Sequence, residues 1–232
     1  MSKFWDQHKK VLLPMGGAVV VLGYMVITGQ LSQDGGLVIF STSSTRGPKS
    51  YDSYPEHVLK DNKDYQARVR VTDYGEFTID LFEEYTPIAV NNFVFLAQDQ
   101  FYNRVSIHKV AKDLLFQTGE PGTDNNDLGY AFKDEFNENV VFNKYVVAYA
   151  NSGRDTNGSE FFVVCPNITD AELKELAGNF TIFGIVTSGQ DVVDKICTNN
   201  YSEIDEDYHP IIISAVTIRT VTTEEDQIND GN

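Results

Sequence analysis

The segment SIHKVAKDLLFQTGEP, residues 106–121, places three chemically capable polar side chains among apolar neighbours. Alternate side chains of a β-strand share a face, so Lys109 is expected on one face of its strand and His108 on the other. Gln117 stands on the following strand, where it can converge with Lys109 on one groove. We interpret Lys109 as a site residue, with a solvated surface lysine as the alternative, and His108 as a hydrogen-bonded core histidine.

Other catalytic signatures do not accompany this segment. The sequence contains no G-x-S-x-G, P-loop or H-E-x-x-H motif, and its four histidines are scattered. The loop DNNDLG, residues 124–129, resembles a calcium loop, but its oxygen ligands are misplaced for an EF-hand. Cys165 and Cys197 form no C-x-x-C pair, and we predict two buried free thiols, with pairing in an oxidising compartment as the alternative. The sequence therefore predicts no metal site and no cofactor.

Composition restricts the class of protein and its partners. A hydrophobic content of 41% in 232 residues fits one packed domain with appendages. The formal net charge is −16, and since residues 1–33 hold Lys3, Lys9 and Lys10 against Asp6, the remainder carries −18. A domain with this much negative charge is repelled by phosphate backbones and by anionic lipid. We therefore exclude nucleic acid as a partner.

The N-terminal region has the character of a membrane anchor. Residues 11–29, VLLPMGGAVVVLGYMVITG, carry no charge, and about 20 apolar residues suffice to cross a bilayer as a helix. A cleaved signal peptide and a buried soluble helix are the alternatives. We predict a cytoplasmic segment over 1–10, marked by Lys9 and Lys10, and a transmembrane helix over 11–31. The acidic body then lies outside the cytoplasm.

The remainder divides into a linker, a folded domain and a tail. Residues 32–64 are mostly polar and interrupted by glycine and proline, which predicts a linker. Alternating apolar residues from 65 onward predict a hairpin around residues 73–75 and then six further strands, at 104–110, 113–117, 144–150, 159–165, 181–187 and 211–222. Thr86 and Pro87 open one predicted helix, and residues 189–197 form a second. We predict a domain over 65–222 and an acidic tail over 223–232.

Several motifs in fixed order resemble the cyclophilin family of peptidyl-prolyl cis-trans isomerases. They include DLFEEYTPIAVNNFVFLA, IHKV, LLFQTGEP, ANSGRDTNGSEFF and NFTIFGIVTSGQDVVDKI, and they extend over about residues 66–222. The resemblance implies a mainly β fold, a closed eight-stranded antiparallel barrel capped by two helices. It also implies binding of proline-containing polypeptides in a groove on the outer face of the barrel, by a monomeric protein.

The resemblance assigns roles to individual residues. Lys109 stands where the family has an arginine that donates to the proline nitrogen, and Gln117 matches the glutamine that holds the peptide carbonyl and that arginine. We therefore predict Lys109 and Gln117 as catalytic residues. The residues predicted to bind substrate are Leu114, Leu115, Ala150, Asn151, Glu160, Phe162, Leu176 and Phe180.

Substitutions at these positions bear on activity. Glu160 replaces a family glutamine, and the family's W-L-D-G-K-H loop becomes Glu175 to Phe180, preceded by a predicted capping box of Thr169 and Glu172. Lysine is a mobile point charge, whereas arginine presents a planar fork, so we expect a slower enzyme. The first hypothesis is a membrane-anchored isomerase that assists the folding of extracytoplasmic proteins. The second is a catalytically silent proline-peptide binding module or chaperone that uses the same groove.

Overall fold

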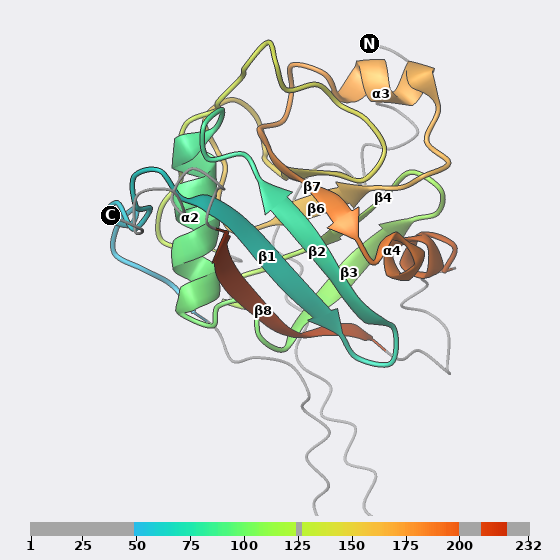
Figure 1. Cartoon of the computed structure of the whole chain (residues 1–232), viewed down its shortest axis with the longest axis horizontal. Helices are drawn as coiled ribbons and strands as arrows, with labels where there is room; N and C mark the ends of the chain where they lie inside the picture. Colours follow the sequence, from blue (N-terminus) through green and yellow to red (C-terminus); the bar gives the residue numbers. More distant parts are fainter. Residues whose placement is uncertain (1–48, 124–126, 200–209, 222–232) are drawn as a thin grey trace, which may run out of the picture.

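The computed structural model describes residues 49–123, 127–199 and 210–221, which form a closed β-barrel with helices around it (Figure 1). The predicted anchor at 11–31 and the predicted tail at 223–232 lie outside these residues. Within the described part of the chain, no helix is both long enough and apolar enough to cross a membrane.

Eight antiparallel strands close the barrel in the order β1-β2-β7-β5-β6-β4-β3-β8. Chain neighbours β1 and β2 form the predicted hairpin, in which Val71 pairs with Gly75. The strands are β1 (Asp64–Val71), β2 (Gly75–Leu81), β3 (Val105–Ala111), β4 (Leu115–Thr118), β5 (Val146–Tyr149), β6 (Phe161–Val164), β7 (Ile182–Ser188) and β8 (Ile211–Val221). The closed eight-stranded antiparallel barrel predicted from the sequence is thus confirmed, with strand limits that differ by up to a few residues.

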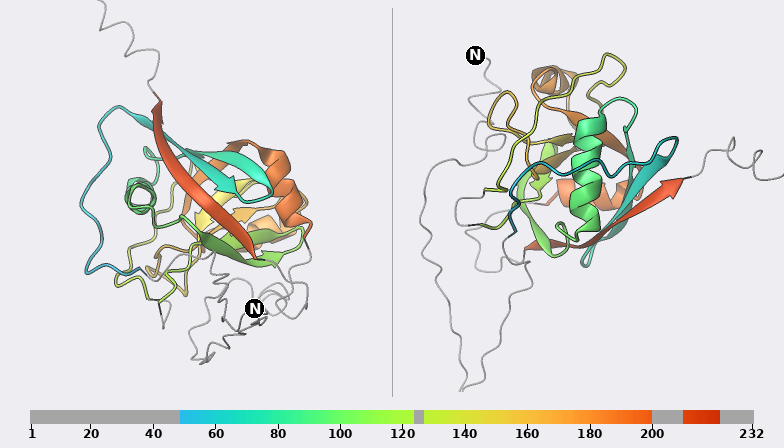
Figure 2. Two further views of the ribbon diagram at one scale, coloured as in Figure 1. Left: turned by 90° about the horizontal axis from the view of Figure 1, so that it is seen from below. Right: turned by 90° about the vertical axis from the view of Figure 1, so that its left-hand side faces the viewer.

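Helices α2 (Pro87–Gln98) and α4 (Gln190–Cys197) lie on opposite sides of the barrel (Figure 1). In the right-hand view of Figure 2, α2 lies across the front of the barrel with the strands behind it. Phe93 of α2 is fully buried and its ring lies 5.0 Å from those of Tyr102 and Phe183, which joins the helix to the barrel core. The third helix, α3 (Asp170–Leu176), is short and begins with the predicted capping box.

The prediction of two free thiols is wrong, because Cys165 and Cys197 form a disulfide. The two residues are 32 positions apart, but their Cα atoms lie 5.8 Å from each other. Cys165 directly follows β6, and Cys197 is the last residue of α4, which packs against β2, β3 and β4. The packing of α4 on the barrel therefore creates a pairing that the spacing along the chain does not reveal.

The described part of the predicted linker packs against the barrel. Tyr51, Tyr54, Val58 and Leu59 contact the main core cluster, and the N–H of Tyr51 donates to the carbonyl of Leu128 at 2.8 Å. The ammonium group of Lys49 lies 2.7 Å from the carboxylate of Asp99, beyond the end of α2. Residues 49–63 therefore cover part of the domain without forming a regular element.

Candidate active site

Strands β3 and β4 pair so that Lys109 stands opposite Gln117. Residues opposite each other in an antiparallel pair project to the same face of the sheet. On its other side, Gln117 pairs with Phe162 of β6. The three residues therefore lie side by side on one face across β3, β4 and β6, as the sequence predicted for Lys109 and Gln117.

The end of β4 passes unusually close to the segment that leads into β6. Gly119 has φ +94°, and a Cβ atom at this position would lie 2.5 Å from the carbonyl oxygen of Ser159. The hydroxyl of Ser159 donates to the carbonyl of Gly119 at 2.7 Å. Glycine is thus required here, and the close approach brings Glu160 beside Gln117.

Glu160 engages the amide of Gln117. Gln117 Nε2 donates to Glu160 Oε2 at 2.6 Å, and the two side chains are almost completely buried. A carboxylate acceptor makes this hydrogen bond stronger than one to the neutral glutamine of the family. A peptide carbonyl that binds this amide must therefore either displace the carboxylate of Glu160 or share the amide with it.

His108 does not point into the core on the opposite face, and that prediction is wrong. The β3–β4 register shifts between Ile107 and Lys109, which leaves His108 as the extra residue of a β-bulge. Such a bulge re-aims a side chain. His108 Nε2 lies 3.6 Å from Glu160 Oε2 and 3.6 Å from Glu120 Oε1. Neither ring nitrogen has a hydrogen-bond partner among the described residues, so His108 is not the predicted hydrogen-bonded core histidine.

The imidazole of His108 is held in its neutral form. Burial is the main cause that lowers the pKa of His108 to about 3, and the positive charge of Lys109 lowers it further. Burial acts in this direction because a charged ring is costly to hold away from water. At neutral pH, His108 therefore presents an uncharged ring beside two carboxylates.

The apolar residues predicted to bind substrate form one packed cluster. The ring of Phe162 lies 5.2 Å from that of Phe180, edge to face, and stacks on Phe142 at 6.3 Å. Phe142 was not predicted, and its one signal in the sequence is an aromatic residue within a mostly polar stretch. The predicted members of the cluster are Leu114, Leu115, Ala150, Phe162, Leu176 and Phe180. All six are buried, so the cluster forms an apolar floor beneath this face of the barrel.

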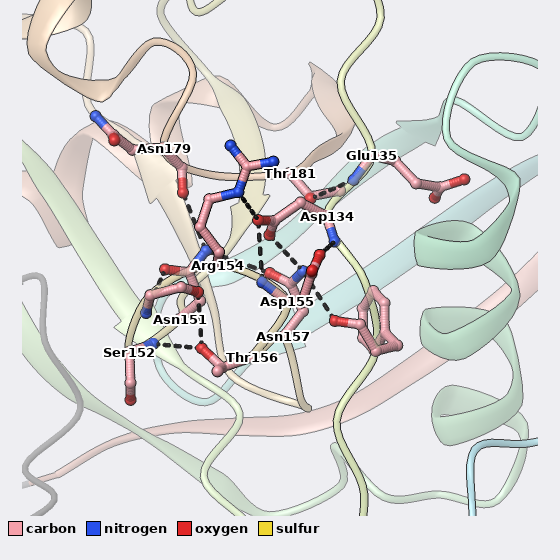
Figure 3. A network of polar contacts seen from close by, with 12 residues as sticks. Asp134, Glu135, Asn151, Ser152, Arg154, Asp155, Thr156, Asn157, Asn179 and Thr181 are labelled. Carbon is pink, nitrogen blue, oxygen red and sulfur yellow. Dashed lines mark hydrogen bonds and ion pairs between the residues drawn. The ribbon is translucent and has the colours of Figure 1, made fainter.

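Ala150 and Asn151 directly follow β5, and Asn151 belongs to a polar network that fixes the chain there (Figure 3). The N–H of Ala150 donates to the carbonyl of Glu160 at 2.9 Å. Asn151 Nδ2 donates to the carbonyl of Asn179 at 3.0 Å. Within the same network, Asn157 Nδ2 donates to Asp134 Oδ1 at 2.9 Å. The side chain of Asn151 is thus used to hold the loop that contains Phe180.

A cavity of about 260 Å³ adjoins this cluster. Phe142 and Phe180 belong to both its wall and the cluster, while Glu135 and Glu138 add carboxylates to the wall. Lys109 and Gln117 do not line it. The cavity therefore borders the cluster without reaching the two predicted catalytic residues.

Comparisons with known proteins agree with this geometry. A family model for cyclophilin type peptidyl-prolyl cis-trans isomerases matches residues 67–221. The chain is 37% identical over 166 residues to the "Probable peptidyl-prolyl cis-trans isomerase A" of Mycobacterium leprae, which covers 63% of this chain and 88% of the relative. It is 38% identical over 130 residues to the peptidyl-prolyl cis-trans isomerase-like 1 of Aspergillus fumigatus, and this match covers 54% of this chain and 78% of the relative.

Solved structures lead to the same family. A Cryptosporidium parvum cyclophilin type isomerase superposes with a TM-score of 0.59 at 25% identity, covering 67% of this chain and 98% of that one. A second crystal structure of that protein, in the presence of the dipeptide Ala-Pro, gives a TM-score of 0.58. With the barrel, the motif order and these matches combined, the chain belongs to the cyclophilin family and is a peptidyl-prolyl cis-trans isomerase.

Proposed function

We propose that this isomerase turns X-Pro bonds in the groove across β3, β4 and β6, with Lys109 as the donor to the proline nitrogen. The observation that carries the proposal is the register that sets Lys109 opposite Gln117, beside Phe162. Rotation about the bond has a barrier of about 18–20 kcal/mol. The twisted amide gains a lone pair on nitrogen, and a charged donor aimed at it lowers that barrier.

The groove offers each part of a proline peptide a matching surface. The apolar cluster of Leu115, Phe162 and Phe180 suits the proline ring. Gln117 suits the carbonyl of the preceding residue, once its hydrogen bond to Glu160 is relaxed. The reaction moves no proton and forms no covalent bond, so it needs no cofactor. Proline-containing segments of polypeptides are the substrates, and the carboxylates of Glu160 and Glu175 favour basic ones.

The isomerase activity is lower than that of a family member with arginine at the position of Lys109. Arginine can hold the peptide and Gln117 together through its planar fork, whereas the lysine ammonium is a single mobile charge. One well-aimed charged hydrogen bond is worth about 1.5–3 kcal/mol, which corresponds to roughly a 10- to 100-fold change in rate.

The isomerase domain acts outside the cytoplasm, tethered as a monomer by the segment 11–31, and assists the folding of extracytoplasmic proteins. The support is the uncharged run over 11–29, preceded by Lys9 and Lys10. The Cys165–Cys197 disulfide is independent support, because disulfides persist in oxidising compartments. Extraction of membranes with alkaline carbonate should leave the full chain in the pellet and release a variant that lacks 11–31.

The second candidate is a silent binding module that uses the same groove. It is favoured by one observation, that the amide of Gln117 is already engaged by a buried carboxylate. In that case the apolar cluster still binds proline, but the amide is not available to assist rotation. The two candidates differ in turnover, since binding is common to both.

Exchange NMR on a short Xaa-Pro peptide with the full chain in detergent distinguishes them. The isomerase predicts accelerated cis/trans exchange that Lys109→Ala abolishes, while Lys112→Ala, an exposed lysine in the β3–β4 turn, has no effect. Peptide shifts without faster exchange would establish the binding module. If neither shifts nor exchange change, both candidates are wrong.

Lys109→Arg measures the contribution of the donor. We expect the exchange rate to rise by about 10- to 100-fold, because the fork of arginine restores the second hydrogen bond. An unchanged rate would locate the deficit in Glu160 or in the Glu175 to Phe180 loop.

A further inference from the structure

A histidine and two glutamates meet beside the groove, and the proposed reaction assigns no role to His108 or Glu120. His108 Nε2 lies 3.6 Å from Glu120 Oε1 and 3.6 Å from Glu160 Oε2. One potential ligand atom from each of the three residues lies within 4.8 Å of the others. The three come from a bulge in β3, the segment after β4 and the segment before β6, so the closed barrel assembles them.

The histidine is the unusual member of this group. The side chain of His108 is 9% exposed, and both of its ring nitrogens lack a hydrogen-bond partner among the described residues. Buried polar groups of folded proteins nearly always have a partner. An unpartnered imidazole aimed at two carboxylates therefore requires an explanation, and a ligand between them provides one.

We propose that His108, Glu120 and Glu160 bind a divalent transition-metal ion of the Zn²⁺ class. Zn²⁺ binds imidazole nitrogen and carboxylate oxygen at about 2.0–2.2 Å, so its tetrahedral ligand atoms are roughly 3.3–3.6 Å apart. The distances of 3.6 Å from His108 Nε2 to the two carboxylates are close to this spacing. Three protein ligands leave the fourth position of the ion for water.

The ligand set decides the class of ion. Calcium and magnesium prefer oxygen ligands and more of them, whereas imidazole with carboxylate suits zinc and its neighbours in the first transition row. The ion can enter past Glu120, whose side chain is 41% exposed. Lys109 stands next in the chain and opposes a cation, but the two carboxylate charges outweigh its single positive charge.

Metal binding is coupled to the groove through one atom. Glu160 Oε2 lies 3.6 Å from His108 and also accepts the hydrogen bond of Gln117 at 2.6 Å. An ion on this oxygen withdraws electron density from the hydrogen bond and changes the environment of the Gln117 amide. The consequence for turnover depends on the function proposed above, whereas metal binding and the change at Gln117 do not.

Titration of the metal-stripped full chain in detergent tests the site. We expect one Zn²⁺ per chain by calorimetry, and Co²⁺ as a coloured probe should give the absorption of a tetrahedral site. His108→Gln and Glu120→Gln should each weaken Zn²⁺ binding by about tenfold or more. The matched controls His57→Gln and Glu84→Gln, both at exposed positions, should bind as the unchanged chain does.

The proposal would be overturned if Zn²⁺ binding survived both His108→Gln and Glu120→Gln, or if His57→Gln removed it. The absence of binding at millimolar Zn²⁺ would overturn it as well. If the buried His108 variant does not fold, the exposed Glu120 variant decides. The coupling has its own readout, the NMR resonance of the Gln117 side-chain amide. This resonance should move on addition of Zn²⁺ to the unchanged chain, and should move in Glu120→Gln only at Zn²⁺ concentrations higher by the factor that its binding is weakened. An unmoved resonance in a chain that binds Zn²⁺ would refute the coupling.

Discussion

At the residue scale, two family residues of the groove are replaced, and Glu160 has an effect beyond its own position, because it engages the side chain of Gln117. Its carboxylate holds the amide of Gln117 at 2.6 Å in an almost fully buried position. The substitution of one family residue therefore acts on a second one that is itself unchanged. We therefore expect activity at this site to depend on residues 117 and 160 together.

Glu160→Gln should lower the KM for an Xaa-Pro peptide by roughly fivefold. A neutral acceptor holds the Gln117 amide about 1 kcal/mol less strongly than a carboxylate does, so a peptide carbonyl can bind it more easily. The measurement is exchange NMR in the presence of EDTA, which keeps metal binding out of the comparison. A raised KM would show that Glu160 contributes to peptide binding directly.

Glu83 predicts a dependence of stability on pH. Burial is the main cause that raises the pKa of Glu83 from 4.5 to about 7 in the folded chain, although its Oε1 accepts the N–H of Tyr65. Between pH 4.5 and about 7 the folded state therefore keeps a proton that the unfolded state has lost. The contribution of Glu83 to stability should therefore fall as pH rises through this window.

Glu83→Gln should remove this part of the pH dependence. The variant keeps an oxygen acceptor for Tyr65 but does not titrate, so its melting temperature should fall less than that of the unchanged chain between pH 4.5 and 7. Thermal melts followed by circular dichroism measure the slope. Glu84→Gln, at the exposed neighbouring position, is the control and should leave the slope unchanged.

At the scale of elements, α3 shows how a short helix supports the groove. Thr169 accepts the N–H of Glu172, and Glu172 Oε2 accepts the N–H of Thr169 at 2.9 Å, which completes the capping box. The helix is too short to be stable alone, so the cap and its packing must hold it. Leu176 at its end is fully buried in the apolar cluster of the groove.

Thr169→Ala should lower the free energy of unfolding by about 1 kcal/mol, because the cap loses its acceptor for the first turn. It should also raise the KM for the peptide, since Leu176, which packs into the apolar cluster from the end of α3, is less well fixed. Urea denaturation and exchange NMR measure the two effects. Thr169→Ser keeps the hydroxyl and should restore both, and a serine variant as unstable as the alanine variant would show that the methyl group matters instead.

At the scale of the whole molecule, the disulfide joins the helix that covers one side of the barrel to the strands of the groove. Cys165 N donates to the carbonyl of Leu114, and Asp113 N donates to the carbonyl of Cys197. The bond therefore lies beside the β3–β4 turn, from which Leu114 enters the apolar cluster. Loss of the disulfide should weaken both the global fold and this turn.

Reduction should lower the free energy of unfolding by about 3–4 kcal/mol, because it frees a loop of 32 residues in the unfolded state. Urea denaturation with and without reductant measures the difference. A double replacement, Cys165→Ala with Cys197→Ala, should be destabilised as well and should not respond to reductant. A chain that is equally stable in both redox states would contradict this prediction.

The sequence alone predicted the order of the eight strands, two of the helices, the convergence of Lys109 and Gln117 on one groove and, through the order of its motifs, the family. The strands and helices depend on local rules, namely alternation along a strand and helix caps, which act over a few residues, whereas the family depends on several motifs in fixed order. The capping box of α3 was predictable for the same reason. The sequence also showed which family positions had changed, although not what each change would contact.

Only the tertiary structure decided the rest. A single bulge in β3 turned His108 toward Glu120 and Glu160. The alternation of side chains along a strand does not predict this orientation, because one extra residue moves a side chain to the other face. The Cys165–Cys197 bond, the Gln117–Glu160 hydrogen bond and the stacking of Phe142 on Phe162 each join separate segments. Such contacts exist once the barrel closes, since closure fixes which distant residues become neighbours.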